Sequence, residues 1–189
     1  MKSRRPSTPR RIFEDEGSAP DLGVDPSSIG EADPGTAARN LALRRLTRAP
    51  QSRAQLEEAL AAKGIPDEVA RQVLDRMTEV GLVNDAEYAA LYVRSRRASR
   101  GLAPRVLAQE LRAKGISDEL IEHELSAINP EDDRALAHAL ISKRLSATAG
   151  LDPQARTRRL ANLLIRKGFS PGLAFEVVRS ALHSDDLLE

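Results

Sequence analysis

A short motif that recurs three times constrains the fold of this chain more than any other feature. Its copies end in Lys63-Gly64-Ile65, Lys114-Gly115-Ile116 and Lys167-Gly168-Phe169, so the glycines are 51 and then 53 residues apart. A leucine stands three residues before each lysine, and a second leucine stands four residues earlier still. A sequence that repeats at a period near fifty residues predicts stacked supersecondary units.

Each copy of the motif has the composition of a helix end followed by a helix start. Leucines four residues apart lie on one face of a helix, and a lysine near the C-terminus complements the helix dipole. Glycine then adopts the left-handed backbone conformation that commonly ends helices. The next residues are Pro66, Ser117 and Ser170, which are typical first residues of a helix. Each copy is therefore predicted to be a helix, a tight turn and a second helix.

A further helix is predicted before each of these pairs, over residues 37–47, 85–98 and 131–147. Helix starts are marked by Asn84 with Glu87, by Ser52 with Gln55, and by Asp152 with Pro153. No stretch alternates apolar and polar residues as a strand would. We therefore predict an all-α fold of three tandem three-helix repeats, stacked as an elongated or curved array.

The domain boundaries follow from the repeat and from the composition. Residues 1–37 are rich in proline and charge and poor in large apolar residues, which predicts a disordered tail. Such a tail is either simply solvated or an auxiliary arm for a partner, and we assign it no role. The repeats are placed at residues 38–83, 84–129 and 130–184, followed by a short acidic tail at 185–189.

Composition excludes several classes of function. The chain has no cysteine, which rules out disulfides and thiolate chemistry and is typical of the reducing cytoplasm. It has no apolar stretch of membrane-spanning length and no secretory leader. His123, His138 and His183 lack the spacing of metal ligands, and phosphate loops and serine-nucleophile motifs are absent. We predict a cytoplasmic protein that is not an enzyme, with no cofactor and no metal.

Basic residues gather near the first and second helices of each repeat, while acidic residues gather at the third. Arginine outnumbers lysine, and its planar fork suits carboxylates and phosphates. Such a surface fits an acidic protein face or a nucleic-acid backbone. The candidate binding residues are Arg94, Arg96, Arg97, Arg100, Arg105, Arg112, Lys114, Lys143, Arg144, Arg158 and Arg159.

The three turns, the segment Asn84-Asp85-Ala86-Glu87-Tyr88-Ala89 and the basic residues that follow it resemble the RecX family of recombination regulators. The resemblance covers about residues 39–183. It implies tandem three-helix repeats and a modulator of the RecA recombinase. Such a protein would bind the RecA filament on single-stranded DNA and would restrain filament growth, ATP hydrolysis, strand exchange and the SOS response. We expect a monomer.

Two other functions are compatible with the residues alone. Three-helix units also occur in helix-turn-helix proteins, so a DNA-binding transcription regulator is one alternative. A scaffold without any nucleic-acid partner is the other. Charge reversal at Arg94, Arg96, Arg97 and Arg100 would impair nucleic-acid or filament binding but not scaffold binding.

Overall fold

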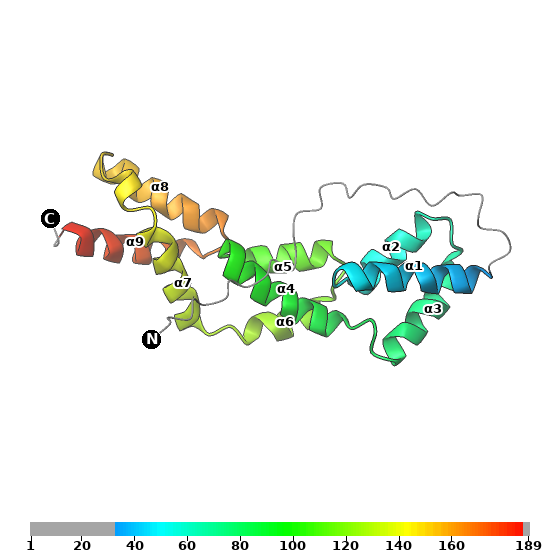
Figure 1. Ribbon diagram of the computed structural model, residues 1–189. Coiled ribbons are helices and arrows are strands. Elements are labelled where there is room, and N and C mark those ends of the chain that lie inside the picture. The colour runs from blue at the N-terminus through cyan, green and yellow to red at the C-terminus, as the bar shows by residue number, and fades with distance from the viewer. Residues whose placement is uncertain (1–32, 187–189) are drawn as a thin grey trace, which may run out of the picture. The chain divides into compact units, whose positions relative to one another are not determined.

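The structure is a computed structural model that describes residues 33–186, and every regular element in that range is helical. The predicted all-α class with three three-helix repeats is therefore confirmed (Figure 1). The chain divides between Tyr88 and Ala89 into two compact units, and each unit is considered by itself. Most of the predicted tail, residues 1–32, lies outside the described residues, as do residues 187–189.

The first unit contains the first repeat, built from α1 (Pro34–Arg48), α2 (Arg53–Ala61) and α3 (Asp67–Glu79). Its core is formed by small and aliphatic side chains, which lets the three helices approach closely. They include Ala38, Ala42, Leu56, Leu60, Leu74 and Met77. The two motif leucines of α2 are fully buried, so the predicted apolar face of this helix is the face that packs.

Helix α1 begins at Pro34, three residues before the predicted start, so residues 34–37 are helical and not part of a tail. The cause is local. The Asp33 carboxylate accepts the Thr36 backbone N–H at 3.3 Å, and Pro34 occupies the first helical position, where its missing N–H costs nothing.

The other predicted helix starts are confirmed. Ser52 and Gln55 form a reciprocal capping box, with side chain to backbone distances of 3.3 Å and 3.1 Å. Asn84 accepts the Glu87 N–H at 3.1 Å. The Asp152 carboxylate accepts two backbone N–H groups at the start of the eighth helix.

The second and third repeats continue the pattern with α4 (Asp85–Arg100), α5 (Pro104–Ala113), α6 (Asp118–Ser126), α7 (Pro130–Ser142), α8 (Pro153–Arg166) and α9 (Pro171–Asp186). Helices α7, α8 and α9 enclose a core that includes Ile141, Leu160, Leu164, Phe169 and Val178, each at most 2% exposed. Phe169 takes the place that isoleucine holds in the first two motifs.

Helix α7 ends at Ser142, five residues before its predicted end at residue 147. A 3₁₀ turn, Ser146–Thr148, follows instead. The Thr148 hydroxyl donates to the backbone of Arg144 and Leu145, and the Arg156 guanidinium donates to Leu145 O. These side chain to backbone bonds compete with the helical ladder and explain the early end.

The three lysine-glycine turns have the same internal geometry. Ile65, Ile116 and Phe169 each donate a backbone N–H to the carbonyl of the motif leucine five residues earlier, at 3.1, 3.1 and 3.2 Å. The three glycines have φ of 73°, 75° and 96°. This is the predicted glycine-terminated helix end, formed three times by equivalent residues.

The third turn also joins the third repeat to the second, within the second unit. Lys167 O accepts the Ala103 N–H at 2.9 Å, and Lys167 Nζ donates to Arg100 O. Gly168 lies directly against Val106: a Cβ at this position would be 2.9 Å from the Val106 backbone nitrogen. The motif lysine and glycine therefore form the junction between two repeats as well as a turn.

Candidate partner-binding surface

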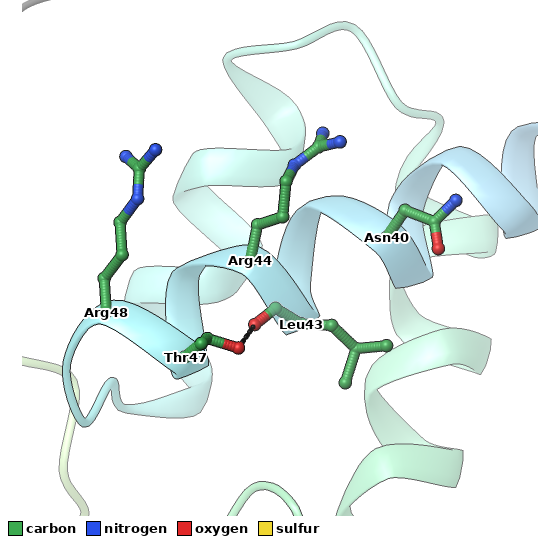
Figure 2. Close-up of a pocket in the computed structure, with 5 residues that line it drawn as sticks. All are labelled: Asn40, Leu43, Arg44, Thr47 and Arg48. Carbon is green, nitrogen blue, oxygen red and sulfur yellow. Dashed lines mark hydrogen bonds between the residues drawn. The ribbon is translucent and has the colours of Figure 1, made fainter. Parts of the chain in front are cut away.

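An exposed strip of helix α1 carries two arginines side by side. Asn40, Arg44 and Arg48 follow one another at four-residue spacing, and Leu43 and Thr47 form the adjoining row (Figure 2). These five residues line a shallow depression of about 470 Å³. Figure 2 shows Arg44 and Arg48 extending from the same side of the helix.

These two arginines differ from most others in the first repeat. Arg53 pairs with Glu57 and Asp75, and Arg71 pairs with Glu68. Within residues 33–186, no carboxylate lies within ion-pair distance of Arg44 or Arg48. Two like charges at four-residue spacing disfavour the helix slightly, and a bound anion would remove that repulsion. The α1 strip is thus a candidate site for a polyanionic partner.

The basic residues of this first helix are not among the candidates predicted from the sequence. One local feature of the sequence agrees with their exposure, although Arg97 shares it. Neither Arg44 nor Arg48 has an acidic residue three or four positions away in either direction, which is where a helical ion-pair partner would stand.

Three of the four candidate arginines on α4 contact groups within the fold. Arg97 forms an ion pair with Asp133 on α7, and both side chains are only 16% exposed. Arg96 lies over the Tyr92 ring, 4.9 Å from its centre. Arg100 approaches Glu110 on α5 at 3.7 Å. Only Arg94 is exposed on α4 with no such contact among the described residues.

Tyr92 lies at the centre of the contacts between α4 and α5. Its hydroxyl donates to Glu110 Oε2 at 2.9 Å, and its side chain is buried. Burial, followed by this hydrogen bond, raises the pKa of Tyr92 above the ordinary value of 10.0. The pair orients Glu110 toward Arg96 and Arg100.

Ultraviolet titration tests this arrangement in the Tyr88→Phe variant, where Tyr92 is the only tyrosine. We expect a midpoint above 10.0, moved downward by a further Glu110→Gln substitution. The neutral phenol is favoured in the folded state. The stability that it contributes is therefore complete below about pH 10 and is lost as the pH rises through the raised pKa. A midpoint at or below 10.0 would contradict the hydrogen bond.

The candidate residues on or next to α5 also form contacts within the fold. Arg105 donates to Ile165 O at 3.2 Å while remaining exposed, and Arg112 pairs with Asp118 at 2.6 Å. Lys114 is half-buried and has an interaction partner. Arg105 and Arg112 therefore connect helix ends within the second unit.

The third repeat supplies the remaining candidates, and they are exposed. Lys143 and Arg144 follow α7, and Arg158 and Arg159 lie on α8. Arg158 donates to Gln154 at 3.4 Å, and none of the four is paired with a carboxylate in the part of the chain that the structure describes. These exposed charges are available to an acidic partner.

No group of three histidine or acidic side chains in residues 33–186 is placed to hold a metal ion. None of the helices in the described range has both the length and the apolar character needed to cross a bilayer. The described surface carries exposed cationic side chains that a partner can contact.

Repeated three-helix units define a tandem helical-repeat protein. Family models match the chain three times: the RecX first three-helix domain at residues 38–77, the second at 84–125 and the third at 131–178. The chain belongs to the RecX family, and the resemblance found in its turns is confirmed.

Individual relatives agree with the family models. The chain is 46% identical to the regulatory protein RecX of Streptomyces coelicolor over 175 residues, covering 90% of this chain and 93% of the relative. It is 47% identical to the regulatory protein RecX of Thermobifida fusca over 148 residues, covering 78% and 80%. The crystal structure of RecX from Lactobacillus salivarius has the same fold, with a TM-score of 0.73 at 22% identity, covering 78% of this chain and 96% of that chain.

Proposed function

We propose that this protein binds the RecA recombinase filament on single-stranded DNA in the cytoplasm. In doing so it restrains filament growth, ATP hydrolysis and strand exchange, and so modulates DNA repair and the SOS response. It acts by binding and not by catalysis. The observation that carries the proposal is membership of the RecX family, whose relatives are named regulatory proteins, along the whole repeat region.

The surface chemistry supports a polyanionic partner. A nucleoprotein filament presents phosphates and acidic side chains, both of which accept hydrogen bonds from guanidinium groups. We assign the contact to seven of the exposed basic residues that lack a carboxylate partner in the described range: Arg44, Arg48, Arg94, Lys143, Arg144, Arg158 and Arg159. Arg96, Arg97 and Arg112 are left out because they serve contacts within the chain.

The direct test is a titration of the full chain into RecA, ATP and single-stranded DNA. We expect ATP turnover and strand exchange to fall as the chain is added. Unchanged turnover at a several-fold excess of this chain over RecA would contradict the proposed function. Sequence-selective binding to duplex DNA under the same conditions would instead favour a transcription regulator.

The α1 strip provides a matched pair of variants for the same assay. Arg44→Glu with Arg48→Glu is expected to raise the concentration for half-inhibition about tenfold at moderate salt, because each lost contact weakens an electrostatic interface. Arg71→Glu with Arg112→Glu also reverses two charges, but these are already paired with Glu68 and Asp118, and we expect it to change inhibition less than twofold. Equal effects of the two variants would show that net charge, and not the strip, determines binding.

A further inference from the structure

A groove in the first unit is lined by apolar and charged side chains. It lies between the first turns of α1 and the C-terminal half of α3, and has a volume of about 510 Å³. Val73, Met77, Val80 and Leu82 supply its apolar surface, and its charged side chains are Arg39, Arg76 and Asp33. The groove lies at the point where the described chain begins, because Asp33 also lines it.

The apolar part of the groove is unusually exposed. Val80 and Leu82 are 54% and 50% exposed, and they are two of the three large apolar side chains left exposed in residues 33–186. Both follow the end of α3, where Leu82 donates its backbone N–H to Met77 O at 2.8 Å. Their positions are therefore held by the helix end. A fixed apolar patch beside charged side chains is typical of a docking surface.

Two of the three charged side chains in the groove are basic, and the Asp33 carboxylate is already engaged as the cap of α1. Arg39 has no carboxylate within ion-pair distance in the described part of the chain. Arg76 pairs with Glu79 at 2.9 Å, but both side chains are more than 60% exposed, so the pair is weak and open to exchange. An occupant that matches the groove carries large apolar side chains next to carboxylates.

One segment of this chain has that composition. Ile12-Phe13 is the only pair of adjacent large apolar residues in residues 1–32, and Glu14-Asp15-Glu16 follows it directly. We propose that residues 12–16 bind in this groove. Ile12 and Phe13 contact Val80 and Leu82, and the three carboxylates face Arg39 and Arg76.

The connecting chain is long enough for this contact. Nineteen residues, 14–32, separate Phe13 from Asp33. A flexible linker of this length has a root-mean-square span of about 25 Å, which is ample for a return to a groove beside its own attachment point. Tethering also places the segment at an effective concentration of about 1 mM, so a weak contact is sufficient for occupancy.

Because the chain has no cysteine, two introduced cysteines report the contact without interference. The test pair is Gly17→Cys with Gln72→Cys, since Gln72 lines the groove. The control pair is Gly17→Cys with Glu58→Cys, which lies exposed on α2 and is not part of the groove lining. Disulfide formation in the full chain under mild oxidation is followed on non-reducing gels, where a bond within one molecule is distinguished from a bond between two.

We expect the groove pair to form an intramolecular disulfide at least tenfold faster than the control pair. Adding Ile12→Ser with Phe13→Ser should slow the groove pair to the control rate. Equal rates for the two pairs, or a rate that does not respond to the serine substitutions, would overturn the proposal. Disulfides only between molecules would assign the groove to a second copy instead. RecA is absent from the experiment, so its result is independent of the proposed function.

Discussion

Replacing Gly168 by alanine is expected to lower the free energy of unfolding of the second unit by about 3 kcal/mol or more. Two costs combine at this position. The backbone has φ of 96°, which a residue with a side chain rarely adopts. The new methyl group would also lie 2.9 Å from the Val106 backbone nitrogen, which cannot move without displacing the start of α5.

Gly64→Ala is the matched control, since Gly64 has the same place in the first turn. Its φ is 73°, but no atom lies within 4 Å of the added methyl group. Only the conformational cost of about 1 kcal/mol remains. Urea denaturation followed by circular dichroism measures both variants, with hydrogen exchange to assign each loss to its unit. A loss at Gly168 no larger than that at Gly64 would disprove the close contact.

Removal of the Arg97 guanidinium is expected to have the second largest effect. Arg97→Met leaves the Asp133 carboxylate, which is only 16% exposed, without its partner. Breaking a fully buried ion pair from one side costs about 3–5 kcal/mol, and the residual exposure here reduces the expected loss to about 2–3 kcal/mol. The lost stability should appear as a weaker association of α4 with α7.

The double variant Arg97→Met with Asp133→Leu tests the cause of that loss. With both charges removed, no isolated carboxylate remains, and we expect at least half of the lost stability to return. Thermal and urea unfolding of the two single variants and the double variant complete the cycle. Strictly additive losses would mean that the two side chains do not interact. In that case Arg97 would again be a candidate for partner contact.

The helices and turns could be predicted because their signals are local. Ser52 with Gln55, and the lysine-glycine turns, contain within a few residues all the groups that form their hydrogen bonds. The predicted helix boundaries were wrong where another local group forms hydrogen bonds that start or end the helix. Asp33 starts α1 earlier than the apolar pattern does, and Thr148 with Arg156 prevents α7 from continuing.

The roles of the arginines could not be predicted in the same way. Arg97 meets Asp133 from 36 residues away, and Tyr92 meets Glu110 from 18 residues away. Whether an arginine is used inside the fold or remains exposed depends on how neighbouring helices pack. Sequence spacing does not specify that packing. The lack of acidic residues one helical turn away does not separate the two groups, because Arg96 and Arg97 share it with Arg44 and Arg48.

Lys167 connects the third repeat to the second repeat, which precedes it in the chain. Its carbonyl and its ammonium group both bond to backbone groups of the preceding repeat, at Ala103 and Arg100. An engineered chain with a fourth repeat after the third would need a lysine-glycine turn in the new repeat. It would also need a backbone N–H at the start of α8 that can donate to the carbonyl of the new lysine. Asp152 precedes Pro153 at that start as Ala103 precedes Pro104 in α5, so the Asp152 backbone N–H is the group that would receive the new turn.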